Sequence, residues 1–246
     1  MFTKILAGGL IGGIVGGILV AAIQTVTTTP LILHAEVYEN AANAEATEKA
    51  PADATAPADH DAMAVEEHHH AAPAGEEEGS SRLILASIAT IGAATGYAWI
   101  VLAAMFLKGE TITARRVIPW AIAGFFATGL VPALGLAPEL PGAAPIDLVA
   151  RQLWWLGTAV AAAAGMASIW FGRGVVWTGL GIVLFVAPFI IGAPEAAGFV
   201  SQAPAELASE FSARSLVVQA LIWIIPAAIA GLVLAKWNGS DRQVAA

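Results

Sequence analysis

Six stretches of the chain contain no Asp, Glu, Lys, Arg or His, and each is at least 21 residues long. The stretches are residues 5–33, 83–107, 117–138, 152–172, 174–194 and 215–235. A helix of this length, rising about 1.5 Å per residue, crosses a hydrocarbon core of about 30 Å. The composition agrees, because 58% of the residues are hydrophobic and only 12% are charged, about half the charged fraction of a soluble domain. The sequence predicts an all-α membrane protein, a six-span helical bundle.

The fourth and fifth stretches are separated by Arg173 alone. They form either one broken helix or a tight hairpin, and we predict the hairpin. The first span is predicted to be retained as an anchor, because its apolar core exceeds the ~7–15 residues of a secretory signal.

Basic residues near the span ends predict the orientation, since they accumulate on the cytoplasmic side. With both termini in the cytoplasm, seven basic residues lie inside and four outside. The inside residues are Lys4, Lys108, Arg115, Arg116, Arg173, Lys236 and Arg242, and the outside residues are Lys49, Arg82, Arg151 and Arg214. We therefore predict a multi-pass protein of the bacterial cytoplasmic (inner) membrane, N-in and C-in.

This topology divides the chain into four parts. Residues 1–33 are the first transmembrane helix, 34–82 an acidic, histidine-bearing extracytoplasmic loop, 83–238 five further transmembrane helices, and 239–246 a cytoplasmic tail. Between residues 41 and 81 the only sizeable apolar side chains are Met63 and Val65. Such a segment cannot bury a core, so we predict one long disordered outer loop, which a bound metal could order.

The predicted loop holds all five histidines and twelve acidic residues. Imidazole and carboxylate groups are ligands for divalent first-row metals, and the candidate ligands within the tract are His60, Asp61, His68, His69 and His70. Their spacing is irregular, which indicates weak cation capture rather than a site of fixed geometry. In the alternative interpretation the histidines are ordinary low complexity and the acids only keep the loop soluble.

Catalytic and redox signatures are missing from the sequence. It has no Cys, which excludes thiolate metal sites and cysteine nucleophiles. There is no P-loop, His-Glu-x-x-His or Gly-x-Ser-x-Gly pattern, and the predicted spans contain no carboxylate or histidine. We predict that the chain is not an enzyme and holds no tightly bound cofactor. The net charge of −8 argues against nucleic acid as a partner.

Small residues and prolines pattern the predicted spans. The first span carries paired glycines at 8–9, 12–13 and 16–17, a repeat that lets helices approach closely in lipid. It indicates either static packing within the bundle or a sliding or dimerising helix, with a possible homo-oligomer. Pro132, Pro188 and Pro226 remove backbone donors inside spans three, five and six. The freed carbonyls could line an ion path, or the prolines are simply tolerated as in many membrane helices.

Several blocks of the sequence resemble the CbtA family of probable cobalt transporter subunits. The blocks are residues 29–39 (TPLILHAEVYE), 137–142 (APELPG) with Asp147, 150–158 (ARQLWWLGT), 191–194 (IGAP), 204–207 (PAEL), Phe211 and 215–216. The likeness covers essentially the whole chain except the histidine-rich tract. It departs from the family before the second span, where a Trp and a Glu-Arg-Thr block usually occur and residues 79–83 keep only Arg82.

The resemblance implies a membrane subunit for cobalt uptake linked to cobalamin synthesis. It implies cobalt(II) as the transported ion and a small single-span, histidine-bearing partner called CbtB. The alternative is a non-transporting membrane scaffold or sensor that binds metal outside and signals to a partner.

The family-like blocks fall at the outer ends of the predicted spans and could form one vestibule. We expect His34, Glu36, Glu39, Glu139, Asp147 and Glu206 to attract the cation there. Arg151 and Arg214 would orient the carboxylates. Gln24 and Gln219, near the outer ends of the first and last spans, could pass the cation inward.

Overall fold

The charge-free stretches form helices, and every secondary-structure element in the described part of the chain is helical. The computed structural model describes residues 2–49, 76–196, 198 and 201–244. The elements are α1 (Phe2–Thr27), α2 (Thr29–Lys49), α3 (Glu76–Leu107), α4 (Ala114–Phe125), the π-helix η1 (Phe126–Leu130), α5 (Val131–Ala133), α6 (Leu148–Phe171), α7 (Val175–Ile191) and α8 (Ala205–Val244). The predicted all-α fold is confirmed.

Five helical segments among the described residues are long and apolar enough to cross a membrane. They are Phe2–Thr27, Ser81–Leu107, Ala114–Ala133, Leu148–Phe171 and Ala205–Asn238. The predicted fifth span forms α7, which is apolar but only 17 residues long. The chain is a multi-pass membrane protein, and the count of six spans stays a prediction.

The buried core lies where α1, α3, α4 and α8 meet. The glycines of α1 explain how closely these helices pack. A Cβ on Gly12 would lie 2.5 Å from the carbonyl oxygen of Pro226 in α8, and one on Gly13 would lie 2.3 Å from the Cα of Thr95 in α3. Glycines 8, 12 and 16 face α8, whereas 9, 13 and 17 face α3. Both glycine repeats are therefore buried within the chain, which supports static packing over dimerisation through this helix.

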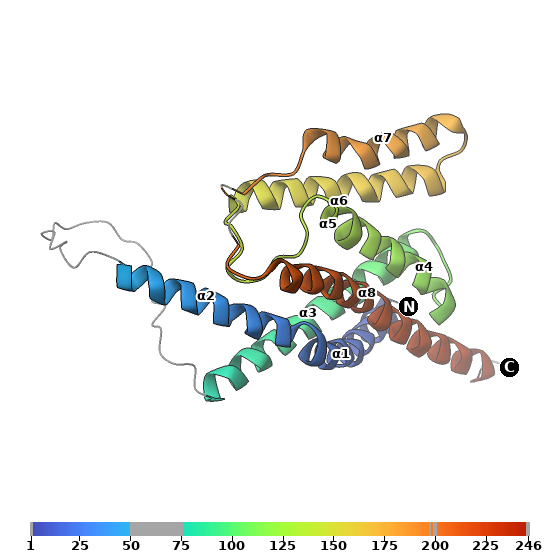
Figure 1. Cartoon of the computed structure of the whole chain (residues 1–246). Coiled ribbons are helices and arrows are strands. Elements are labelled where there is room, and N and C mark those ends of the chain that lie inside the picture. The colour runs from blue at the N-terminus through green and yellow to red at the C-terminus, as the bar shows by residue number, and fades with distance from the viewer. Residues whose placement is uncertain (1, 50–75, 197, 199–200, 245–246) are drawn as a thin grey trace, which may run out of the picture.

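The bundle is built in tiers (Figure 1). The α6–α7 hairpin lies, through α6, on α4, η1 and α5. Of these, α4 lies on α3 and α8, and α1 packs on the other side against α3 and α8. The hairpin was predicted from the single charge between the two stretches, and it is confirmed. Gly172 ends α6, and Gly174, at φ +91°, begins α7 in a backbone conformation that other residues rarely adopt. Gly165 and Gly181 face each other where the two helices pack.

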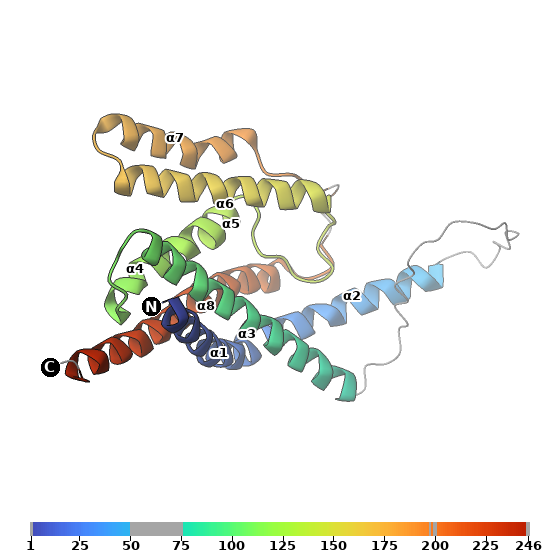
Figure 2. The same ribbon diagram turned by 180° about the vertical axis from the view of Figure 1, so that it is seen from behind.

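The first two helices differ from the predicted boundaries. The stretch 5–33 was expected to be one span, but α1 ends at Thr27 and α2 begins at Thr29. Pro30, which cannot donate a backbone hydrogen bond, lies at the start of α2. Both views show α2 projecting from the end of the bundle opposite the two termini (Figures 1 and 2).

The helices also shorten the predicted loop. Residues 34–49 are helical in α2, and α3 begins at Glu76, so both ends of the segment 34–82 are ordered helix. The loop was predicted to be disordered because the segment has few hydrophobic residues. Residues 41–49 are nevertheless rich in Ala and Glu, which are strong helix formers. Residues 50–75 lie outside the described residues.

One of the three predicted proline breaks coincides with a change of helix type. The π-helix η1 ends two residues before Pro132, and the N–H of Val131 donates to the carbonyl of Phe126, five residues earlier. Pro188 and Pro226 lie inside α7 and α8, which continue past them. Pro226 instead forms the surface against which Gly12 and Gly16 of α1 pack.

Candidate functional site

Three segments distant in sequence meet at the end of the bundle from which α2 projects, here called the α2 end. A small apolar cluster joins them: Leu31 and Ala35 of α2 pack with Leu140, Ala203 and Leu207. Leu140 belongs to the turn after α5, and Ala203 and Leu207 flank the start of α8. The blocks expected to form one vestibule are therefore neighbours in the fold.

Hydrogen bonds fasten the turn at residues 138–142 to the last helix. The Ser212 hydroxyl of α8 donates to the Pro138 carbonyl at 2.6 Å, and the Gln202 N–H donates to the Gly142 carbonyl at 3.2 Å. Gly142 has φ +78°, and a Cβ there would lie 3.5 Å from the Cβ of Glu39 on α2. The turn is thus held between α2 and the beginning of α8.

Three carboxylates at the α2 end pair with arginines. Glu36 of α2 pairs with Arg82 of α3. Glu139 Oε2 lies 2.8 Å from Arg151 Nη1 of α6. The third pair, Glu210 with Arg214, joins successive turns of α8. Each of these carboxylates is therefore paired with an arginine, and a cation that binds one directly has to compete with a guanidinium.

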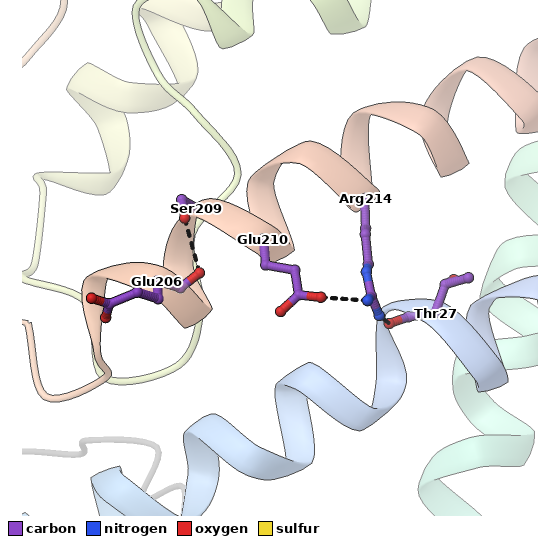
Figure 3. Close-up of polar contacts among 5 residues, drawn as sticks. All are labelled: Thr27, Glu206, Ser209, Glu210 and Arg214. Carbon is purple, nitrogen blue, oxygen red and sulfur yellow. Dashed lines mark hydrogen bonds and ion pairs between the residues drawn. The ribbon is translucent and has the colours of Figure 1, made fainter.

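Arg214 also connects the last helix to the first. Its Nη1 donates to the carbonyl of Thr27, the last residue of α1, at 3.2 Å. Figure 3 shows the guanidinium between the Glu210 carboxylate and this carbonyl, with Glu206 and Ser209 one turn further toward the start of α8. Because α2 begins two residues after Thr27, this contact fixes the point from which α2 projects.

The remaining predicted residues are held separately. Asp147 caps α6, where Oδ1 accepts from the Ala150 N–H at 2.8 Å. The Gln24 side-chain carbonyl in α1 accepts a hydrogen bond from the Thr90 hydroxyl of α3 at 2.7 Å. His34 and Glu206 are exposed, and the His34 ring lies 5.5 Å from that of Tyr38. These contacts indicate structural roles for Asp147 and Gln24.

No group of three His, Asp or Glu side chains within the described residues is placed to hold a metal ion. The candidate ligands His60, Asp61, His68, His69 and His70 lie outside the described residues. The outer polar layer, defined by nine side chains, nevertheless carries an excess of three negative charges, because six are carboxylates and three are guanidinium groups. The nine are Glu36, Glu39, Arg82, Glu139, Asp147, Arg151, Glu206, Glu210 and Arg214. Such an excess attracts cations without a fixed coordination geometry.

A cavity of about 510 Å³ opens beside this layer, between η1, α5, α6 and α8. Its polar lining comes from Arg151 and Gln152 of α6, Gln219 of α8 and Thr128 of η1. Gly129 brings the π-helix so close to α8 that a Cβ would lie 2.9 Å from Gln219 Oε1. Pro132 also lines the cavity and has no N–H for the carbonyls one turn earlier. The cavity thus places a guanidinium, two amides and a hydroxyl beside irregular backbone.

A family model described as a probable cobalt transporter subunit, CbtA, matches residues 2–235. The chain belongs to the CbtA family. No curated protein and no solved structure matches it. The family is described as a transporter subunit, a role that implies a membrane and at least one partner.

Four polar residues of this CbtA-family chain were not among the predicted site residues. Arg82 and Glu210 complete two ion pairs, and Thr128 and Gln152 line the cavity. The i,i+4 spacing of Glu210 and Arg214 is a signal that sequence alone contains. The contact of Arg82 with Glu36 has no local signal, because 46 residues separate them.

Proposed function

We propose that this chain is the integral membrane subunit of a cobalt uptake system linked to cobalamin synthesis. The cation is captured from outside by the carboxylate and histidine groups of the α2 end. The observation that carries the proposal is the position of the cavity lined by Gln152 and Gln219 directly beside the acidic excess of the outer polar layer. Beside Arg151, the cavity offers neutral oxygen groups from Gln152, Gln219 and Thr128, and oxygen groups are among the ligands of divalent cations.

The proposed topology has six spans with both termini in the cytoplasm. Its support is that the two termini lie at one end of the bundle and α2 at the other (Figure 1), which an even number of crossings produces. α7 has 17 residues, or about 25 Å of helix, which lies at the lower limit for a span. The basic residues favour the same orientation, in the inner membrane of a bacterium.

The capture step has a direct test. Replacing Glu36, Glu39 and Glu139 by Ala is expected to abolish cobalt accumulation by cells that express the chain with its partner subunit. Glu110, whose carboxylate lies 3.4 Å from Arg116 at the opposite end, supplies the matched control: Glu110→Ala removes an exposed, paired carboxylate and should leave uptake intact. Undiminished uptake by the triple variant, at equal membrane abundance, would refute capture at the α2 end.

The partner is proposed to be a small single-span, histidine-bearing CbtB-type subunit, as the family implies. A scaffold or sensor that binds metal without transporting it is the competing function. Liposomes containing a metal-sensitive dye distinguish the two functions. Dye response in vesicles with both subunits supports transport, whereas metal binding to the protein without a dye response supports the sensor.

A further inference from the structure

A second cavity, of about 280 Å³, lies on the opposite half of the bundle from the outer polar layer. Its walls come from the last turns of α3 and α6, and its floor comes from α4 and η1. The lining is apolar and aromatic, with Trp120, Trp170 and Phe171 toward the end of the bundle that holds both termini. On α3 the lining residues begin at Ile100, about 12 Å along the helix from Lys108. The groove is therefore an apolar slot that runs along α3 and α6 toward the end of the bundle that holds both termini, and this end of it is here called its mouth.

Basic side chains surround this mouth. Lys108 directly follows α3, and its Nζ lies 3.7 Å from the ring centroid of Phe171, which lines the groove. Arg173 follows Phe171 by two residues. Arg115 lies one turn before Pro119 on the same face of α4, and Pro119 also lines the groove. Three cations are thus placed around one apolar opening.

The charges at the mouth are not neutralised by nearby acids. Among the described residues, no carboxylate pairs with Lys108, Arg115 or Arg173, and all three are exposed. Arg116, beside Arg115, differs because it pairs with Glu110 at 3.4 Å. The mouth therefore fits an anion, and the slot fits a hydrocarbon chain.

The charge and lining of the groove decide the occupant, because three basic side chains suit an anionic headgroup and the apolar lining suits an acyl chain. We propose that the groove binds an anionic phospholipid, with one acyl chain in the slot and the phosphate group among Lys108, Arg115 and Arg173. Basic pockets between transmembrane helices on the cytoplasmic side bind such headgroups in other membrane proteins.

Tryptophan quenching by brominated lipids tests the proposal, because Trp120, Trp170 and Trp223 line the groove. The full chain is reconstituted in phosphatidylcholine vesicles that contain an equal fraction of either brominated phosphatidylglycerol or brominated phosphatidylcholine. Brominated phosphatidylglycerol is expected to quench more strongly. Lys108→Gln, Arg115→Gln and Arg173→Gln should each lower this preference about fivefold, and the triple variant should lose it. Equal quenching of the unsubstituted chain by the two lipids would overturn the proposal.

Two further variants separate a built site from general surface charge. Arg116→Gln removes the same charge at the same end and should keep the preference; if it loses the preference as Arg115→Gln does, the site does not exist. Ala163→Phe with Ala167→Phe fills the slot from α6 and should reduce quenching by both lipids. If this double variant instead converts a dimer into a monomer and leaves the lipid preference unchanged, the groove is an interface between copies and the proposal fails.

Discussion

Arg214 shows how a single side chain at the α2 end serves two contacts. It bonds the Thr27 carbonyl of α1 and pairs with Glu210 on its own helix. The two contacts differ in expected energy, because a hydrogen bond from a charged group to a carbonyl contributes about 1.5–3 kcal/mol, whereas an exposed i,i+4 pair contributes about 0.3–0.5 kcal/mol. Since Arg214 is itself partly exposed, the lower part of the first range applies.

This difference predicts the ranking of two variants. Arg214→Gln removes both contacts and should lower the midpoint of thermal unfolding in detergent by more than Glu210→Gln, which removes only the pair. Equal losses would mean that the bond to Thr27 contributes nothing to holding α1 and α8 together.

Gly142 is a second residue whose backbone the site requires. Its φ of +78° disfavours any side chain, and a Cβ would lie 3.1 Å from Gln202 Oε1. Gly142→Ala should destabilise the protein by roughly 1–2 kcal/mol from backbone strain and displace Glu39 from the turn. Gly157→Ala, where a Cβ meets no atom within 4 Å, serves as the control and should be neutral or slightly stabilising in thermal unfolding.

Among the helices, α1 is the one that most depends on its glycines. One face of α1 contacts α3 and another contacts α8. A Cβ added at any of its paired glycines would therefore collide with one of these two helices. Sequence pattern predicted the close approach, but not that both partners belong to the same chain. That outcome depends on how α3 and α8 are placed by the rest of the bundle.

The glycines of α1 and α3 give a matched comparison. Gly12→Ala puts a Cβ 2.5 Å from the Pro226 carbonyl oxygen and should strongly reduce stability and membrane abundance, since overpacking costs about 1–3 kcal/mol. Gly92→Ala adds the same methyl group to a helix position where nothing lies within 4 Å, and it should be tolerated. The packing account of α1 is refuted should both variants unfold at the same temperature.

For the whole molecule, cysteine labelling tests whether α7 crosses the membrane. The chain contains no Cys, so a single introduced cysteine is the only reactive thiol. Single cysteines at Arg173 and Glu195, on either side of α7, should react oppositely with a membrane-impermeant thiol reagent applied to intact cells. We expect labelling at 195 and none at 173. Labelling at both positions or at neither would show that α7 does not cross, and the bundle would then have five spans.

The two proposed sites lie at opposite ends of the bundle and differ in charge. The α2 end gathers acidic residues, and the other end gathers Lys108, Arg115 and Arg173, for which the described part of the chain shows no carboxylate partner. In the proposed topology, a cation from outside meets the negative excess first, and the proposed anionic lipid meets the basic mouth of the groove between α3, α4 and α6. On the same topology, the two ends present opposite charges to the two membrane surfaces.

The sequence by itself determined the helices, because a charge-free stretch of 21 or more residues has to satisfy its backbone internally in lipid. It also predicted the α6–α7 hairpin, from the single charge at Arg173, and it predicted that the family blocks lie at one end, from counting spans. The helix boundary at Thr27 was missed because it lies inside a charge-free stretch. The helix up to Lys49 was missed because low hydrophobicity predicts exposure rather than loss of helix.

Tertiary structure decided which charges pair. Asp147 and Arg151 have the spacing of a helix pair, yet Asp147 caps its helix and Arg151 contacts Glu139 from the preceding turn. The contact of Glu36 with Arg82, the cavity beside the outer polar layer and the apolar groove all form only when distant helices come together. The spacing of residues along one helix cannot predict these contacts, because exposed side chains pair with whichever group lies near them in the folded bundle.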